Sequence, residues 1–388
     1  MRILGKGITG KSIKNLYQNA SLYDEKNIDD FDVNSNELTV ISPGISPFHY
    51  FVKNSKNIIS EYDLLLNLDN TPLSIWISGT NGKSTTTKMA QKLLSKYNSS
   101  MGGNIGIPLA SMNRKSDIWI LETSSFTLHY TNKVSPNIYV LLPVNQDHIS
   151  WHGSFEKYKK SKLKAMDNMS ESEIAIIPKE FEYYPTMAKK IVYESSDDLC
   201  NIFSINKSKI NFKEPFLLDA ILSLCISSIL FDEIDYKVIN EYEIDEHTLE
   251  EVYDFKNRLW INDSKATNIN ATMSILDTFK NQKIYLILGG YDKGIDLEPL
   301  IKKLSLIDNI ELFFIGLNFE KLLKLSLNYN LNYNICNELE KAVLKIDKKL
   351  DINSICILSP AFSSLDQFIS YKERGDLFKR FIKKLSCI

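Results

Sequence analysis

A glycine-rich loop followed by Lys-Ser gives the clearest chemical signal in the sequence. The string GTNGKST occupies residues 79–85, between an apolar segment, SIWIS, and a segment with helical periodicity that begins TTTKMAQ. Gly79 and Gly82 let the backbone bend so that its N–H groups face an anion, and the helix N-terminus adds partial positive charge. Lys83 would reach the β- and γ-phosphates of a nucleotide, and the Ser84 hydroxyl would serve Mg²⁺. These residue types in this order predict a nucleotide phosphate site.

The loop departs from the usual GxxxxGK[ST] pattern, because Ile77 stands where the first glycine of that pattern would be. The segment is therefore either a shorter variant of a phosphate loop or an ordinary turn before a helix. The agreement of strand, glycines, Lys-Ser and helix favours the phosphate loop. We expect the nucleotide to contact the whole loop, namely Gly79, Thr80, Asn81, Gly82, Lys83, Ser84 and Thr85.

A second glycine-rich turn lies at the start of the chain. Residues 5–10, GKGITG, match GxGxxG, and Asp24 stands nineteen residues beyond Gly5, after the short segment SLY. Alone this pattern suggests a dinucleotide-binding fold and a nicotinamide-dependent oxidoreductase. A lone GxGxxG is a weak signal, so another diphosphate ligand and a purely structural turn stay open as alternatives.

Three further segments carry groups that suit metal or phosphate binding. Glu122 follows an apolar run, IWIL, which favours a position at the end of a strand. His148 and His152 have i, i+4 spacing, which suggests zinc, but Ile149 stands where a zinc protease has Glu. The segment KYKKSKLK (157–164) holds five lysines, and its residues alone indicate a solvated helix face or a weak nucleic-acid-binding patch.

Alternating apolar and amphipathic segments predict the elements that position these groups. Short apolar runs, typical of buried parallel strands, alternate with helical patterns, which favours an α/β fold with mostly parallel sheets. The runs are SIWIS (74–78), IWILE (118–122), IYVLLPV (138–144), IYLILGG (284–290), LFFIGL (312–317) and ICILS (355–359). Breaks near Thr71-Pro72 and near Glu246 suggest domains at 1–72, 73–246 and 247–388.

Composition excludes several classes of protein. The 388 residues are 44% hydrophobic and 24% charged, which excludes a disordered chain, a collagen-like fibre and a coiled-coil rod. The net charge of −2 argues against a protein that mainly coats nucleic acid. The five cysteines form no CxxC, so neither a disulfide framework nor a cysteine zinc site is expected. The longest apolar stretch, 217–231, is too short to span a bilayer and predicts a core helix, and we expect a soluble cytoplasmic protein.

Several further strings, taken in order along the chain, resemble the Mur ligase family of ATP-dependent amide-forming enzymes. The resemblance runs from Gly5 to Phe378 and so covers almost the whole chain. Besides GTNGKST, the strings that carry it are GGNIGIPL (102–109), LETSSFTL (121–128), NQDHISWHG (145–153), NDSKATN (262–268), LGGYDKG (288–294) and SPAFSSLDQF (359–368).

The resemblance implies three domains: an N-terminal Rossmann-like UDP-binding domain, a central ATPase-type domain with a parallel sheet and a phosphate loop, and a C-terminal Rossmann-like domain for the incoming amino acid. GGNIG, SKATN and SPAFSSLDQF resemble the branch that joins D-glutamate to UDP-N-acetylmuramoyl-L-alanine through an acyl phosphate, in the cytoplasmic synthesis of peptidoglycan precursors. Neither nucleic acid nor membrane insertion is expected, and the chemistry does not require an oligomer.

The resemblance also implies roles for single residues. Lys83, Glu122, His148 and Lys162 would form the catalytic centre, where Lys162 carries a carbamate. Two Mg²⁺ ions would be held by Ser84, Glu122, His148 and the Lys162 carbamate. Asp263 and Lys265 would approach ATP from the C-terminal domain. The substrate-binding residues would be Thr9, Asp24 and Asn104 for the UDP-sugar acid, and Thr267, Lys293, Ser364 and Tyr371 for D-glutamate.

Two positions depart from the family pattern. His247-Thr248 stands where the family has His-Arg, and Thr cannot replace a guanidinium that contacts a nucleotide. In EPFLLDA (214–220), Phe216 and Asp219 stand where the family has asparagines near the adenine. These departures leave a non-catalytic nucleotide-binding regulator as an alternative, beside a ligase for another amino acid, a folylpolyglutamate synthase-like enzyme and the oxidoreductase.

Overall fold

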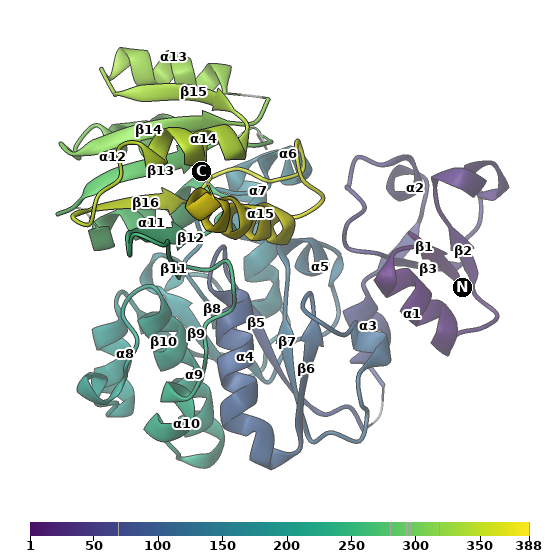
Figure 1. The fold of residues 1–388 in the computed structure, drawn as a ribbon. Coiled ribbons are helices and arrows are strands. Elements are labelled where there is room, and N and C mark those ends of the chain that lie inside the picture. The colour runs from purple at the N-terminus through teal and green to yellow at the C-terminus, as the bar shows by residue number, and fades with distance from the viewer. Residues whose placement is uncertain (69, 280, 292–293, 295, 318, 388) are drawn as a thin grey trace. The chain divides into compact units, whose positions relative to one another are not determined.

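The computed structural model describes residues 1–68, 70–279, 281–291, 294, 296–317 and 319–387. The chain divides into two compact units, Met1–Tyr242 and Glu243–Ile388. The described part of the first unit contains a four-stranded and a six-stranded sheet, and that of the second a six-stranded sheet (Figure 1). The predicted α/β architecture with mostly parallel sheets is confirmed. The unit boundary lies close to the expected one at 246/247, whereas the limit at residue 72 stays a prediction.

The first sheet is a small parallel sheet with strand order β2-β1-β3-β4. Its apolar strand residues, such as Ile3 and Val40, are fully buried. Its elements are β1 (Arg2–Leu4), α1 (Ile8–Leu16), β2 (Ser21–Tyr23), η1 (Glu25–Asp30), β3 (Leu38–Ile41), α2 (Tyr50–Lys53), β4 (Asn57–Ile59) and α3 (Glu61–Leu65). Because parallel strands end at one edge, the glycine turn after β1, Asp24 after β2 and Ser42 after β3 share that edge.

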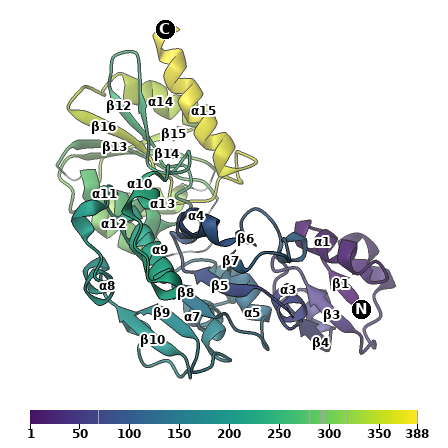
Figure 2. The same ribbon diagram turned by 90° about the horizontal axis from the view of Figure 1, so that it is seen from below.

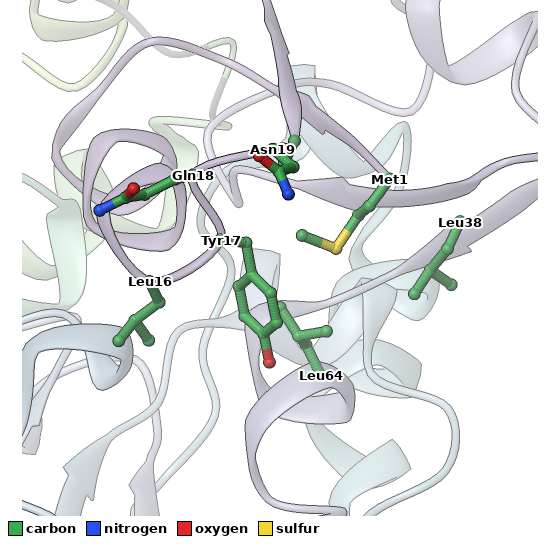
Figure 3. A pocket seen from close by; sticks show the side chains of 8 residues that line it. Met1, Leu16, Tyr17, Gln18, Asn19, Leu38 and Leu64 are labelled. Atoms are coloured by element: carbon green, nitrogen blue, oxygen red, sulfur yellow. The ribbon is translucent and has the colours of Figure 1, made fainter.

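A pocket of about 510 Å³ lies at the opposite edge of this sheet, where the strands begin (Figure 3). Met1 and Leu38 stand at the starts of β1 and β3, and Leu16 and Tyr17 at the end of α1, while α3 contributes Leu64. The pocket is therefore separate from the edge that carries the glycine turn and Asp24.

The second sheet has the order β10-β9-β8-β5-β7-β6 and is entirely parallel. Its strands are β5 (Leu73–Ser78), β6 (Ser99–Gly103), β7 (Ile118–Glu122), β8 (Ile138–Leu141), β9 (Ile174–Pro178) and β10 (Lys189–Tyr193). The chain builds outward from β5 in one direction through β7 and β6, and in the other through β8. The carboxyl end of β5 is thus a switch point, the usual place for a ligand in a parallel sheet.

The helices of this region are α4 (Lys83–Leu94), α5 (Ser125–Tyr130), α6 (Ile149–His152), α7 (Phe155–Leu163), α8 (Ser196–Phe203), α9 (Phe216–Phe231) and α10 (Tyr236–Asn240). The short 3₁₀ turns are η2 (Ser95–Tyr97), η3 (Leu109–Ser111), η4 (Lys164–Met166), η5 (Lys179–Phe181) and η6 (Lys207–Lys209). The apolar stretch 217–231 forms most of α9, which packs against α4 as the predicted core helix (Figure 1). Within the described residues, none of the helices has the length and apolar character that a membrane crossing requires.

The second unit contains one sheet of order β11-β12-β16-β13-β14-β15, in which only the edge pair β11–β12 is antiparallel (Figure 2). Its strands are β11 (Glu250–Tyr253), β12 (Leu259–Asn262), β13 (Lys283–Leu288), β14 (Ile310–Ile315), β15 (Tyr333–Asn337) and β16 (Ser354–Leu358). Its helices are α11 (Ile269–Phe279), α12 (Glu298–Leu304), α13 (Glu320–Asn328), α14 (Leu339–Asp347), α15 (Tyr371–Lys384) and the short η7 (Leu385–Cys387).

Helix α3 ties the two sheets of the first unit together through polar contacts. The Glu61 carboxylate accepts the backbone N–H of Ala110 at 2.8 Å, and Asp63 accepts the backbone N–H groups of Asn132 and Lys133 at 2.8–3.1 Å. Both acids are buried. Burial raises the pKa of Glu61 to about 7, although the backbone donors oppose that rise. This junction is therefore sensitive to pH.

The raised pKa gives a stability prediction with a definite sign. A protonated Glu61 is favoured in the folded state, so its contribution is complete below about pH 4.5 and is lost as pH rises through about 7. The loss is on the order of 2–3 kcal/mol. Glu61→Gln should therefore flatten the dependence of Tm on pH between about pH 5 and 8, measured by calorimetry at constant ionic strength. The exposed Glu171→Gln serves as control, and parallel curves for wild type and Glu61→Gln would refute the assignment.

Candidate active site

The phosphate loop leaves β5 after Ser78 and enters α4 at Lys83. Gly79 and Gly82 have φ values of 144° and 83°, which side chains rarely adopt. A Cβ atom at Gly82 would lie 2.4 Å from Asp219 Oδ1 and 2.5 Å from Leu142 Cδ2. The two glycines are thus required by backbone conformation and by close packing, as the sequence pattern predicts.

Hydrogen bonds hold the loop against neighbouring segments. Thr80 Oγ1 lies 3.0 Å from Tyr158 Oη and accepts the backbone N–H of Asn145 at 2.9 Å. The Lys83 ammonium folds back over the loop and donates to the carbonyl oxygens of Gly79 and Thr80 at 3.0 and 2.8 Å. The loop after β5 therefore meets the loop after β8 and helix α7 at the switch point.

Glu122 ends β7 and is buried. Its Oε2 accepts the Ser84 hydroxyl at 2.6 Å, and its Oε1 accepts Asn104 Nδ2 at 2.6 Å. The structure thus brings together one carboxylate, the hydroxyl of the phosphate loop and the amide of the GGNIG string. Carboxylate and hydroxyl oxygens are ligands that Mg²⁺ prefers.

Lys162 is the buried exception in the lysine-rich segment. Lys157 and Lys160 are exposed on α7, whereas Lys162 is 1% exposed. Lys162 Nζ donates to the Gly79 carbonyl at 2.7 Å and lies 3.4 Å from Ser78 Oγ. Burial, and next the charge of Lys83, lower the pKa of Lys162 well below its usual value, while Asp147 and Glu122 oppose that shift. A solvated helix face is therefore wrong for Lys162.

His148 lies just before α6 in a left-handed conformation, with φ 52°. Asp147 holds it there: Asp147 Oδ1 accepts the backbone N–H of His148 at 2.7 Å, and Oδ2 lies 3.6 Å from His148 Nε2. Asp147 is buried and electrostatically coupled to Lys162. Sequence reasoning missed Asp147, although a carboxylate directly before the singled-out histidine, just beyond a buried strand, was a usable signal.

The altered segment 214–220 lies at the start of α9, behind the phosphate loop. Asp219 is buried and accepts the Thr86 hydroxyl at 3.1 Å. It is also the residue that a side chain at Gly82 would strike. The departure from the family pattern at Asp219 thus adds a buried carboxylate that supports the phosphate loop from the side of α9.

The two predicted substrate residues of the first sheet lie at its carboxyl edge. Thr9 is in the first turn of α1, and Asp24 caps η1. Lys6 Nζ donates to Asp24 Oδ1 at 3.0 Å and holds the pKa of that carboxyl below its usual value. Lys6, which sequence reasoning did not single out, therefore adds a cation to this edge.

In the second unit, Asp263 and Lys265 follow β12. Asp263 is buried, accepts the Ser359 hydroxyl at 2.8 Å, and has its pKa raised to about 7 by burial. Lys265 Nζ lies 3.5 Å from Asp245 Oδ2. Both residues are at the carboxyl edge of this sheet.

The predicted amino-acid-binding residues lie near that edge. Thr267 follows Lys265, and Ser364 is in the loop after β16. Tyr371 begins α15, and its backbone carbonyl accepts the Ser264 hydroxyl at 2.7 Å. Lys293 lies outside the described residues.

Arg258 does not replace the guanidinium that Thr248 lacks. Its side chain is buried and ion-paired with Asp254 Oδ2 at 2.7 Å and with Asp347 at 2.5 Å. It fastens the β11–β12 turn to the end of α14. Thr248 Oγ1 is buried without a hydrogen-bond partner among the described residues.

Comparison with known proteins places these features in context. Residues 77–214 match the Mur ligase middle domain. UDP-N-acetylmuramoylalanine–D-glutamate ligase of Campylobacter jejuni strain 81-176 is 48% identical over 92% of this chain and 89% of its own length. The Helicobacter pylori HPAG1 protein of that name is 44% identical over 92% and 88%. A MurF ligase from Thermotoga maritima in complex with ADP shares the fold, with a TM-score of 0.63 and 14% identity over 99% of this chain and 95% of that one.

The packing around Gly82 gives a testable consequence. Gly82→Ala places a Cβ against Asp219 and Leu142 in a left-handed conformation, whereas Gly106→Ala creates the same kind of backbone strain with no atom within 4 Å. We expect Gly82→Ala to lower Tm by more than twice the shift of Gly106→Ala, which strain alone sets at roughly 1–2 kcal/mol. Thermal unfolding followed by circular dichroism measures both, and equal shifts would contradict the tight packing.

Proposed function

The chain belongs to the Mur ligase family, and we propose that it is an ATP-dependent ligase that joins D-glutamate to UDP-N-acetylmuramoyl-L-alanine. The observation that carries this proposal is the Campylobacter relative, whose name states that activity and which aligns with 92% of this chain. The meeting of Lys83, Glu122 and Lys162 around the phosphate loop supports it. The oxidoreductase suggested by the first glycine turn explains none of these residues.

We propose a division of labour among three domains. Residues 1–72 bind the UDP-sugar acid at the carboxyl edge of the first sheet, where Thr9 and Asp24 lie. Residues 73–246 bind ATP on the phosphate loop. Residues 247–388 supply the amino-acid site, with Asp263 and Lys265 turned to the nucleotide in the working enzyme. The work is done in the cytoplasm, where nucleotide-activated precursors are made.

The reaction proceeds in two balanced steps. A carboxylate oxygen of the sugar acid attacks the γ-phosphorus of ATP, the bond to the β,γ-bridging oxygen breaks, and ADP leaves. The amine of D-glutamate then attacks the acyl carbon, the bond from carbon to the phosphate oxygen breaks, and phosphate leaves while the amine loses its proton. Lys83 and the backbone N–H groups of the loop counter the negative charge that would otherwise keep the two anions apart.

The donor set suits Mg²⁺ at two positions. Ser84 and Glu122 already meet through their oxygens at 2.6 Å, and Asn104 orients the other carboxylate oxygen. His148 and a carbamate on Lys162 would hold a second ion. Bound Mg²⁺ would neutralise phosphate charge and polarise the acceptor carboxylate. The Asp147 carboxylate fixes His148 for that task.

We propose that Lys162 carries the carbamate. Its neutral amine, favoured by the lowered pKa, attacks CO₂: a C–N bond forms, one C=O π bond of CO₂ breaks, and a proton leaves. The carbamate nitrogen keeps one hydrogen, which matches the single close carbonyl acceptor, Gly79 O at 2.7 Å. The change from cation to anion also removes the repulsion from Lys83.

For D-glutamate, we propose that Lys293 and Ser364 bind the carboxylates, with Thr267 and the backbone near Tyr371 as further donors. A dicarboxylate requires a cation and several hydrogen-bond donors, and these residues supply both types. The stereochemical preference for the D-isomer follows from the shape of this pocket.

Phosphate release tests the proposed function directly. Purified protein with ATP, Mg²⁺ and UDP-N-acetylmuramoyl-L-alanine should release phosphate when D-glutamate is added, and far less with L-glutamate, D-aspartate, L-lysine or diaminopimelate. A malachite-green assay with each amino acid measures the rates. Turnover with another amino acid would reassign the substrate, and no turnover with any would refute the ligase.

The carbamate gives a second test. Lys162→Ala should lower kcat by at least ~100-fold, because it removes the anion that holds the second metal ion. Short-chain carboxylic acids, such as acetate, should restore part of the activity by occupying the vacated site. Lys160→Ala, an exposed neighbour on the same helix, is the matched control and should behave like wild type. Wild-type turnover in Lys162→Ala would remove Lys162 from the mechanism.

A further inference from the structure

His152 is a buried side chain that the proposed chemistry does not use. It ends the single helical turn α6, and its ring packs among Phe126, Trp151 and Tyr158. His152 Nε2 lies 3.0 Å from Ser125 Oγ, and Nδ1 lies 3.4 Å from Ser161 Oγ. Both ring nitrogens therefore face serine hydroxyls, which excludes the zinc site that the i, i+4 spacing with His148 suggested.

The hydrogen bonds of Ser161 indicate which nitrogen carries the proton. Ser161 Oγ donates to the Lys157 carbonyl at 2.9 Å, which can only accept. Its single proton is thereby committed, so Ser161 Oγ accepts from His152 Nδ1–H. A neutral imidazole has one N–H, so His152 Nε2 is an acceptor and receives the Ser125 hydroxyl proton. Burial supports the neutral form, because it lowers the pKa of His152 to about 3.

The two serines and the helical turn belong to the three segments that carry the proposed metal ligands. Ser125 stands three residues after Glu122, and Ser161 immediately precedes Lys162. His152 itself ends the turn that begins at His148. One imidazole thus joins the end of β7, the start of α6 and the end of α7.

His148 needs such support. A non-glycine residue at φ 52° persists only where its surroundings fix it, and α6 has only four residues. The other end of α6 is loosely held, since Trp151 Nε1 lies 3.4 Å from its acceptor, the Gly44 carbonyl. The stronger contact is that of His152 with Ser125.

We propose that His152 is a positioning residue that, as a neutral imidazole with its proton on Nδ1, holds the segments of Glu122, His148 and Lys162 in the register needed for metal binding. This inference rests on the proposed function in one respect, since it takes these three residues as the metal ligands. Groups that orient metal ligands typically contribute 10–100-fold to metal affinity or activity.

The first test is the tautomer of His152 in the wild-type protein without ligands. A two-bond ¹H–¹⁵N correlation spectrum, assigned with His152→Gln, should show a neutral ring protonated on Nδ1 at pH 7. A ring protonated on Nε2, or a charged ring, would overturn the inference. This measurement requires no turnover, so it stands even if the proposed function fails.

The second test is the Mg²⁺ requirement of phosphate release. His152→Leu removes both hydrogen bonds and should raise the Mg²⁺ concentration for half-maximal activity by roughly 10-fold, with kcat largely recovered at high Mg²⁺. His152→Gln keeps a polar group toward Ser125 and should recover most of the loss. His129→Leu is the matched control: His129 also contacts Ser161, at 3.3 Å, but lies on α5 and not on α6, and its Mg²⁺ requirement should match wild type.

The outcomes separate the two proposals. An unchanged Mg²⁺ requirement in an active His152→Leu variant overturns the positioning role and leaves the ligase intact. Equal shifts in His152→Leu and His129→Leu also overturn it, because the effect would then come from general packing. If His152→Leu does not fold, His152→Gln and the wild-type tautomer decide. Absence of turnover in wild type refutes the ligase, and the tautomer alone then decides on His152.

Discussion

A lysine amine buried against the backbone of an anion-binding loop is the constraint on which the site depends. Lys162 is 1% exposed, and its Nζ lies 2.7 Å from the Gly79 carbonyl. A charged ammonium there would lose its hydration beside the cation of Lys83, and both effects favour the neutral amine. A neutral amine is a nucleophile, so the fold prepares Lys162 for a covalent change that its exposed neighbours cannot match.

The fold creates this position through the topology of the second sheet. Strands β5, β7 and β8 are neighbours, so the phosphate loop, Glu122 and the Asp147-His148 pair emerge at the same edge. Helix α7 then returns across that edge and brings Tyr158 and Lys162 to the loop. The site is thus assembled from strand ends and one helix, with Asp219 supporting the loop from behind.

The sequence alone predicts the parts of this site whose signals are local. The apolar runs identify the strands, and IWILE coincides with β7. The glycines of the phosphate loop predict its backbone, because the need for φ > 0 is a property of residue type. The resemblance to a family singles out Lys162, since five lysines in one segment look alike until the tertiary structure buries one of them.

Other features depend on contacts between distant segments and leave no local pattern. Arg258 resembles a free cation in the sequence, yet it is consumed by Asp254 and Asp347. The pairing of Glu61 with the Ala110 backbone, and of His152 with two serines, likewise requires the folded chain.

The most direct measurement of the central claim is ¹³C NMR of the protein equilibrated with ¹³C-labelled bicarbonate. The account predicts a carbamate resonance in wild type that is absent from Lys162→Ala and unchanged in Lys160→Ala. A spectrum without a carbamate signal at any accessible bicarbonate concentration, or a signal that persists in Lys162→Ala, would contradict it.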